Sequence, residues 1–293
     1  MATLAKLSRV ALNRILLATD FSPESLNALH SAVSLAKRYN AAIFLAHVLP
    51  SEGSTIAAEG WSLPTEAVRR SAEKSMARLE AAGELDSIDH EIIIRNGITW
   101  DVISQILDEK NVDLLVMGTH GDKAVRKLFL GSTAETASRH ATCPVLTVGP
   151  HVELTSGERF HHILYASDFS SGSLRALTYA LALAEDDRSE VTLLHVIESK
   201  PASEAEMLEW KREDTDRLRR MMPSGMDLAY QPEVEIEIGI PEVEIVRLAD
   251  TRNAGLIVMG SHTGGAVSTH VPWTTLHHVL RNAHCPVLTV RGE

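Results

Sequence analysis

The chain has 293 residues, of which 44% are hydrophobic, and a formal net charge of −11. This length suits one large domain or two ordinary ones, and the apolar content is sufficient for a sizeable core. The acidic balance and the lack of a Lys/Arg-rich run argue against a nucleic-acid partner. No stretch approaches the roughly 20 apolar residues of a membrane span, so no membrane partner is expected.

In the first half of the chain, short apolar runs alternate with helical patterns. Ser22-Pro23 is a typical helix start, with an N-cap residue followed by a proline at the first helical position. Continuously apolar runs such as Ile92-Ile93-Ile94 are typical of parallel strands that are covered on both faces. The predicted strands are 14–19, 42–48, 90–95, 113–118 and 144–149, and the predicted helices are 23–39, 65–83, 98–110 and 131–141. Five strands with intervening helices form an open, doubly wound α/β domain, in which ligands bind beyond the carboxyl ends of the strands.

The second half of the chain repeats the first in the same order. The segment 14–22 returns at 162–170, 45–48 at 193–196, 95–98 at 237–240, 115–120 at 257–262 and 141–148 at 283–290. We therefore predict two copies of one domain, residues 1–150 (repeat one) and residues 151–293 (repeat two). The polar joining segment, 149–159, is short, so the two domains are expected to pack closely.

The two cysteines, Cys143 and Cys285, each precede a proline at the start of a predicted last strand. Two cysteines exclude a disulfide framework, and the N-terminus shows neither a long apolar segment nor a small-residue cleavage site. We therefore expect a reducing, cytoplasmic setting. Both cysteines are expected to be small core residues.

The strongest functional motif is GTHGDKAVRKLFLGST, at residues 118–133. Three glycines, Gly118, Gly121 and Gly131, lie between a predicted strand and a predicted helix. Glycine lets the backbone approach an anion closely, and the free N–H groups at a helix N-terminus attract negative charge. This order of strand, glycine-rich loop and helix predicts a phosphate site.

A purely structural interpretation exists beside this one. The glycines can be ordinary turn residues after a strand. Residues 132–135 match a capping box, in which the Ser132 hydroxyl and the Glu135 carboxylate satisfy helix N–H groups without any ligand. Asp20, after the first predicted strand, can cap the next turn, and it recurs as Asp168 in repeat two.

The Ala18-Thr19-Asp20 and His47-Val48 strand ends, the glycine motif and the last strand at 143–148 together resemble the universal stress protein family. The resemblance covers both repeats, as in tandem members of the family. It implies two five-stranded parallel sheets in the strand order 3-2-1-4-5, each with a ligand crevice between strands 1 and 4. The spacing G-x2-G-x9-G-[ST] is that of the ATP-binding branch of the family, and repeat one matches it in full.

By this resemblance, repeat one holds ATP, with or without Mg²⁺. The end of strand 1 would line the adenine and ribose pocket, the end of strand 2 would pack against adenine, and the glycine motif would hold the phosphates. Lys123 and Arg126 would add positive charge, although the family motif does not specify them. The implied nucleotide-binding residues are Ala18, Thr19, Asp20, Val48, Met117, Gly118, His120, Gly121, Gly131, Ser132 and Thr133.

Repeat two departs from this motif. At the positions of Gly121 and Gly131 it has Thr263 and Trp273. A large side chain at the second position would keep phosphate away from the backbone, so we expect one nucleotide site per chain. The residues that remain for a partial, adenine-facing site are Asp168, Val196 and Gly260.

The resemblance implies an ATP-binding regulatory protein of the stress-response type that acts as a binding switch. The nearest candidate general base is His120, so at most slow ATP hydrolysis is expected and no catalytic residue is assigned. An adenylating ligase is disfavoured, because the first loop, ATDFSPES, lacks the SGG-x-DS and HIGH-type motifs of such enzymes. The alternative is a structural or interaction protein without a physiological nucleotide, in which the duplication acts as a built-in dimer.

Family members pair the last strands of two domains across a pseudo-twofold axis. Segments 144–148 and 286–290 would pair in this way within the chain, which removes two exposed sheet edges. Association of two chains and the identity of a protein partner stay open. The histidines show no spacing typical of zinc, so no metal site is predicted. His47 and His195 match at a strand end and are expected to make the same structural hydrogen bond. The longer connection at 50–64 is either a flap over the adenine end or a simple surface insertion.

Overall fold

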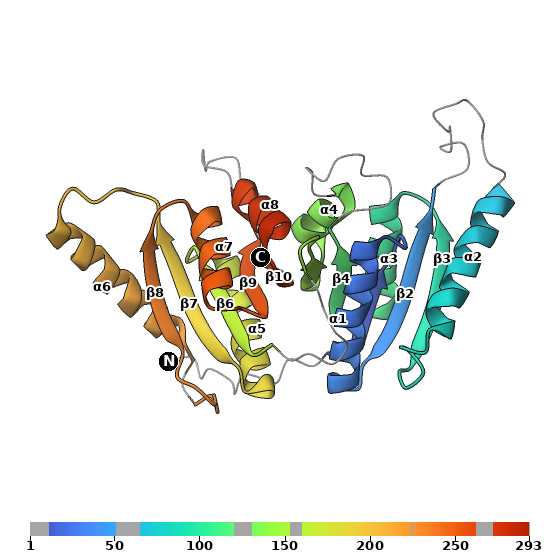
Figure 1. Ribbon diagram of the computed structural model, residues 1–293, viewed down its shortest axis with the longest axis horizontal. Coiled ribbons are helices and arrows are strands. Elements are labelled where there is room, and N and C mark those ends of the chain that lie inside the picture. Colours follow the sequence, from blue (N-terminus) through green and yellow to red (C-terminus); the bar gives the residue numbers. More distant parts are fainter. Residues whose placement is uncertain are drawn as a thin grey trace, which may run out of the picture.

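The computed structural model of the chain describes residues 12–50, 65–119, 131–152, 160–223, 225–261 and 272–292 (Figure 1). Repeat one contains β1 (Arg14–Ala18), α1 (Pro23–Tyr39), β2 (Ala42–Leu49), α2 (Thr65–Ala81), β3 (His90–Asn96), α3 (Thr99–Lys110), β4 (Leu114–Gly118), α4 (Ser132–His140) and β5 (Val145–Val148). Repeat two contains β6 (His162–Ser167), α5 (Ser171–Asp187), β7 (Glu190–Ile197), α6 (Glu204–Met221), β8 (Glu233–Ile238), α7 (Pro241–Thr251), β9 (Leu256–Ser261), α8 (Pro272–Asn282) and β10 (Val287–Arg291). The strands and helices predicted for repeat one are all present. Of the connection at 50–64, predicted as a flap or an insertion, residues 51–64 lie outside the described residues.

The strands form one ten-stranded sheet in the order β3-β2-β1-β4-β5-β10-β9-β6-β7-β8. Within each repeat all neighbouring strands are parallel and follow the predicted order 3-2-1-4-5. The two halves join where β5 and β10 run antiparallel, with Leu288 opposite Leu146. The α/β fold and the pairing of the last strands are therefore confirmed, and the two predicted sheets are one continuous sheet.

The two faces of the sheet carry different cores. On the face covered by α1 and α5, a single apolar core runs through both repeats, and Leu146 and Leu288 of the joining strands belong to it. On the other face the core is divided into one cluster under α3 and α4 and a second cluster under α7 and α8. The strands can be continuously apolar because each successive side chain enters one of these two layers.

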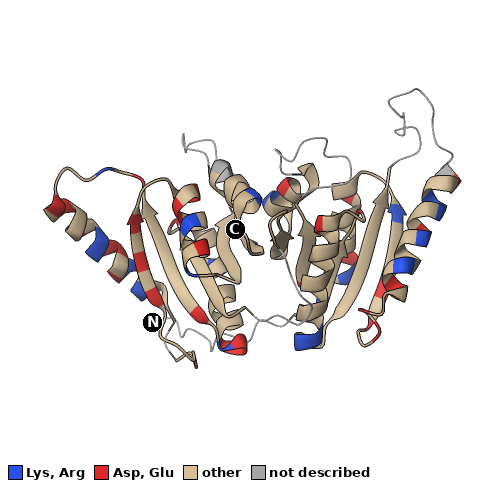
Figure 2. Cartoon of the chain, viewed as in Figure 1, with Lys and Arg blue, Asp and Glu red and all other residues tan. Residues whose placement is uncertain are grey.

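Charged residues are concentrated at the two ends of the sheet (Figure 2). The strands β4, β5, β6 and β9 carry no Lys, Arg, Asp or Glu. On the outer strand β3, Glu91 binds Lys110 at 2.6 Å, and on the outer strand β8, Glu237 binds Arg247 at 2.8 Å. Charges on edge strands discourage further strand pairing, so the sheet ends here. Within the described residues, no helix combines the length and the apolar character that crossing a membrane requires.

The C-terminal ends of α1 and α5 meet between the repeats. Arg38 forms an ion pair with Asp187, and Tyr39 donates a hydrogen bond to Asp186 at 2.9 Å. The Asp187 side chain is 1% exposed and that of Arg38 is 16% exposed, so the ion pair is almost dry. Asp187 also accepts a hydrogen bond from the Phe160 N–H. Burial, together with the bond to Asp186, raises the pKa of Tyr39, which keeps its hydroxyl protonated as a donor.

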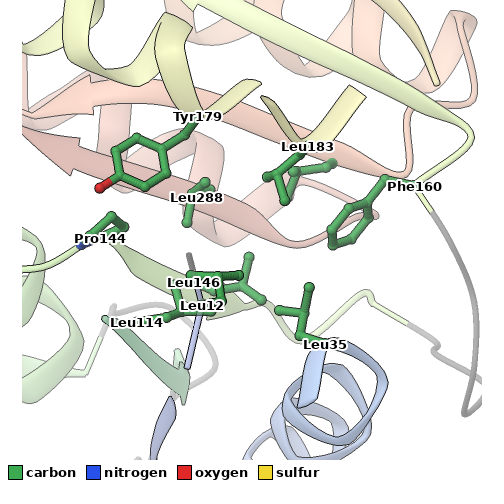
Figure 3. A pocket seen from close by; sticks show the side chains of 10 residues that line it. Leu12, Leu35, Leu114, Pro144, Leu146, Phe160, Tyr179, Leu183 and Leu288 are labelled. Atoms are coloured by element: carbon green, nitrogen blue, oxygen red, sulfur yellow. The ribbon is translucent and has the colours of Figure 1, made fainter. Parts of the chain in front are cut away.

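A small apolar cavity of about 20 Å³ lies between the repeats on the same face (Figure 3). Its volume is close to that of one water molecule, and its lining presents no polar surface, so water has no partner there. We interpret it as a packing gap in the contact between the repeats. It is far too small for a nucleotide. The lining residues are Leu12, Leu35, Leu114, Pro144, Leu146, Phe160, Tyr179, Leu183, Leu256 and Leu288.

The buried ion pair generates a stability prediction. Arg38→Met leaves the Asp187 carboxylate buried without its cation, so we expect the free energy of unfolding in urea to fall by about 3 kcal/mol. Arg95→Met removes the exposed Arg95–Glu109 pair and serves as a matched control with a much smaller effect. If the two variants lose equal stability, Arg38 and Asp187 do not hold the repeats together.

Candidate functional site

The carboxyl ends of β1 and β4 lie side by side at the centre of repeat one. Ala18 of β1 is opposite Met117 of β4. The chain leaves β1 for α1 on one face of the sheet and leaves β4 toward α4 on the other face, which is the arrangement of a switch-point crevice. Thr19 holds the end of β1 in place, because its N–H donates to Ala46 at 2.9 Å and its Oγ1 lies 3.0 Å from Ser25 Oγ.

The turn after β1 is held in an uncommon conformation. Phe21 has φ 67°, a left-handed value that bulky residues rarely adopt. Asp20 accepts a hydrogen bond from the Ser22 N–H at 3.1 Å and so caps its own turn. His47 of β2 lies with Nδ1 2.8 Å from the Thr19 carbonyl oxygen, so Nδ1 donates, and its ring is 4.5 Å from that of Phe21. The predicted structural hydrogen bond of His47 is confirmed.

An apolar surface lies at the carboxyl edge between β2 and β4. Ala18 and Val48 are half-buried, and Met117 is 5% exposed. All three pack on the core under α3 and α4. The three residues predicted to contact the base and the adjoining sugar therefore share one face and one edge of the sheet.

The predicted phosphate end lies at the start of α4. Gly131 is the N-cap of this helix and makes no side-chain cap hydrogen bond, and its N–H donates to the Thr119 carbonyl at 2.7 Å. Its φ of −61° and ψ of 136° are accessible to any residue, so the backbone does not require glycine here. What glycine provides is the absence of a side chain beside the helix N-terminus. Ser132 is exposed and Thr133 is half-buried in the first turn.

The predicted capping box at residues 132–135 is wrong. Ser132 is the first helical residue, so its hydroxyl is one position too late to act as the N-cap. Glu135 does not reach back along the chain and instead binds Arg139 at 2.7 Å. The N-terminus of α4 therefore lacks the side-chain cap that the sequence pattern indicates.

Gly118 has a structural reason to be glycine. A Cβ at this position would lie 2.9 Å from the Glu24 carbonyl carbon and 3.0 Å from the Ser25 nitrogen. In repeat two, a Cβ at Gly260 would lie 2.3 Å from the Ser173 nitrogen. Real Cβ contacts of this length with backbone are essentially absent, so the close packing of β4 on the start of α1, and of β9 on the start of α5, accounts for both glycines.

The described residues of the predicted set lie together at the carboxyl edge of repeat one. His120 and Gly121 lie outside the described residues, as do Lys123 and Arg126. Within the described residues, no group of three or more His, Cys, Asp or Glu side chains has the arrangement of a metal site.

Repeat two keeps the apolar edge but differs at the aspartate. Ala166, Val196 and Met259 are 7%, 8% and 7% exposed. Asp168 accepts hydrogen bonds from the Ser170 N–H, at 3.0 Å, and from the Ser173 hydroxyl. Its carboxylate is therefore tied into its own turn.

The matching serine of repeat one, Ser25, bonds elsewhere. Its hydroxyl donates to the Ser22 carbonyl at 2.9 Å and lies near Thr19 Oγ1. The two aspartate sites thus differ in local bonding, although the sequence around them is nearly the same.

Repeat two also places charged side chains of α6 against its β6–α5 turn. The Arg217 guanidinium lies 3.8 Å from the centre of the Phe169 ring, and Asp214 Oδ2 lies 3.8 Å from His195 Nε2. His195 Nδ1 lies 2.8 Å from the Ser167 carbonyl oxygen, which confirms that it makes the same structural bond as His47.

Two features of the site were not predicted. One is the role of Ser25, which has no motif of its own. The other is a pair of isoleucines, Ile98 and Ile240, which are 67% and 59% exposed just after β3 and β8. Ile98 and Ile240 occupy the same position in the matched segments 95–98 and 237–240. The repetition therefore showed that the two residues correspond, but not that they are exposed.

The close packing at the two strand-end glycines gives one prediction. Gly118→Ala should lower the free energy of unfolding by about 1–3 kcal/mol, because the neighbouring helix backbone must shift. Gly260→Ala should cost more, since its Cβ would approach backbone more closely. Urea unfolding of the two variants measures the order, and an equal or reversed order would contradict the packing explanation.

The cysteines give a second prediction. Burial raises the pKa of both Cys143 and Cys285 to about 12, so at pH 8 both thiols are protonated and poorly nucleophilic. We expect the folded protein to resist iodoacetamide at pH 8 and the urea-unfolded protein to be alkylated at both sites, as measured by mass. Rapid alkylation of the folded chain would show an accessible thiolate instead.

Comparison with known proteins agrees with this architecture. The profile of the universal stress protein family matches the chain twice, at residues 11–149 and 159–291. A universal stress protein of Methanocaldococcus jannaschii is 29% identical over 143 residues, covering 46% of this chain and 81% of the relative. The universal stress protein A homolog 1 of Coxiella burnetii is 31% identical over 140 residues, covering 46% of this chain and 94% of the relative.

Similar solved structures extend over both repeats. The crystal structure of a universal stress protein from Archaeoglobus fulgidus matches with a TM-score of 0.70 and 23% identity, covering 98% of each chain. This likeness concerns the fold, including the arrangement of two domains in tandem. With two matches to the family profile that together span most of its length, the chain belongs to the universal stress protein family.

Proposed function

We propose that repeat one binds an adenine nucleotide, ATP, in the crevice between β1 and β4, and that the chain acts as a nucleotide-dependent regulatory protein with little or no turnover. Repeat two, in this proposal, binds no triphosphate and serves as the folded partner of repeat one. The proposed domain boundary falls between residues 150 and 151.

The observation that carries this proposal is the start of α4 beside the crevice, where the N-cap residue Gly131 makes no side-chain cap hydrogen bond. The first N–H groups of a helix have no partners within the helix, and they bear partial positive charge. At most helix starts a polar side chain satisfies some of them, as Ser22 does for α1 by accepting from the Ser25 N–H. At α4 the N-cap is Gly131, which has no side chain to do so. An anionic phosphate is the ligand that this arrangement favours.

The dimensions of the edge suit a nucleotide. Neighbouring strands are about 4.8 Å apart, so Val48 on β2 and Gly118 on β4 are separated by about 10 Å, with β1 between them. A base on the apolar surface of Ala18 and Val48 would place its phosphates near α4. The glycine motif, which includes His120 and Gly121, leads from the end of β4 to the start of α4. Its position in the sequence supports the same orientation, with the phosphates toward α4.

The described side chains at the start of α4 favour binding over hydrolysis. Glu135, the acidic residue of the first turn, is held by Arg139 at 2.7 Å, so its carboxylate is already neutralised. Ser132 is an exposed hydroxyl that can donate to a phosphate oxygen. We therefore assign Ser132 to phosphate recognition and no residue to catalysis.

Isothermal titration with ATP, with and without Mg²⁺, tests the proposal, and we expect one site per chain. Gly131→Trp copies the residue at the matching position of repeat two and places a large side chain at the helix start. The loss of two charge-assisted hydrogen bonds predicts a fall in ATP affinity of about 100-fold or more. Adenosine, which has no phosphate, should bind the variant as it binds the natural chain.

Three results would contradict the proposal. The absence of any heat of ATP binding to the natural chain would favour the interaction-protein alternative. The Gly131→Trp variant binding ATP unchanged would remove α4 from the site. Binding of two ATP molecules per chain would show that repeat two is a functional site.

A further inference from the structure

The exposed isoleucines Ile98 and Ile240 occupy positions where isoleucine is unfavourable. Ile98 is the N-cap of α3 and Ile240 is the N-cap of α7, both with extended backbone and neither with a side-chain cap hydrogen bond. Ser, Thr, Asp and Asn are strongly preferred at N-caps because they accept a hydrogen bond from the helix N–H groups. An isoleucine here leaves those groups uncapped and also exposes its own apolar surface. Helix stability therefore does not account for it.

Ile98 lies at the carboxyl edge of repeat one, next to the end of β2. The N–H of Gly97 donates to the Leu49 carbonyl at 2.9 Å, which fastens the turn after β3 to β2. Ile98 follows directly and opens α3, whose Val102 belongs to the same core cluster as Met117. The residue is therefore fixed on the face of the sheet that carries the proposed site.

Ile98 lies beyond the end of β3, on the outer side of the apolar edge. In the strand register Met117 is opposite Ala18, and Val48 lies two residues beyond the β2 partner of Ala18. The β3 partner of Val48 is Arg95, and Ile98 follows Arg95 by three residues. The apolar residues of this edge become more exposed away from α4, from 5% at Met117, through half-burial at Ala18 and Val48, to 67% at Ile98. The most exposed apolar side chain thus lies where the far end of a nucleotide would lie, one strand beyond Val48.

We propose that Ile98 is a specificity-determining residue that forms the outer wall of the base site in repeat one. It contacts the flat, apolar face or edge of a purine and is covered by it. This proposal rests on the proposed function, since it assigns the part of the same site that recognises the base.

Repeat two supplies a matched control inside the same molecule. Ile240 has the same capping position and nearly the same exposure, but it lies far from α4 at the other end of the sheet. The variants Ile98→Ser and Ile240→Ser each introduce a good N-cap at a backbone conformation that suits it. Each should raise the melting temperature of the ligand-free chain by about 2 °C.

The two variants should differ in binding. Ile98→Ser should weaken both ATP and adenosine by about tenfold, because a base contact is common to the two ligands. Ile240→Ser should bind both as the natural chain does. Ile98→Leu keeps an apolar side chain and should retain most of the affinity. This pattern differs from that of Gly131→Trp, which should weaken ATP binding and leave adenosine binding unchanged.

Titration calorimetry and thermal unfolding of the natural chain and of the Ile98→Ser, Ile240→Ser and Ile98→Leu variants test the role of Ile98. A more stable Ile98→Ser variant with weakened binding of both ligands supports the proposal. Unchanged affinity of Ile98→Ser for ATP and adenosine, in a natural chain that binds them, overturns this proposal alone. If the natural chain binds neither ligand, the proposed function and this inference fail together. A loss of affinity equal in Ile98→Ser and Ile240→Ser also overturns it, because the effect would then not be local.

Discussion

The antiparallel pairing of β5 with β10 is the contact on which the rest of the molecule depends. Each repeat alone would end in a short, largely buried strand with an unpaired edge. Pairing the two edges satisfies their backbone groups and turns two sheets into one. It also brings the Ser261 hydroxyl, at the end of β9, within 2.8 Å of the Ser138 carbonyl in α4, so repeat two supports the helix at which we propose that phosphate binds.

The same pairing gives the two faces of the sheet separate tasks. On the face of α1 and α5 the cores merge, and the buried ion pair of Arg38 with Asp187 joins the C-terminal ends of these two helices. On the opposite face the cores stay apart, so each repeat keeps its own edge of Ala, Val and Met side chains. The shared apolar core thus lies on one face, and the candidate sites lie on the other, where hydrogen bonds from Ser261 and Arg291 to α4 join the repeats.

Much of this was predictable from the sequence because it depends on local patterns. Continuous apolar runs identify buried parallel strands, Ser22-Pro23 identifies the start of α1, and the repetition identifies the tandem fold. The errors and omissions have a different cause. The pattern at 132–135 indicates a cap at Ser132, but α4 begins one residue earlier, with Gly131 as its N-cap, and Glu135 binds Arg139 instead. Likewise, Ser25 and Ser173 occupy equal positions and bond to different partners, which no local pattern encodes.

The contact between the ends of α1 and α5 has a consequence for the history of the duplication. Both helices have 17 residues and matching caps, so Arg38 corresponds to Asp186 and Tyr39 to Asp187. In an isologous dimer each surface must complement itself, and two copies of repeat two would set four carboxylates against one another. Joining the copies in one chain removed the demand for self-complementarity. Each repeat then needed to fit only the other repeat, so the loop after its fourth strand could change without affecting the contact between them.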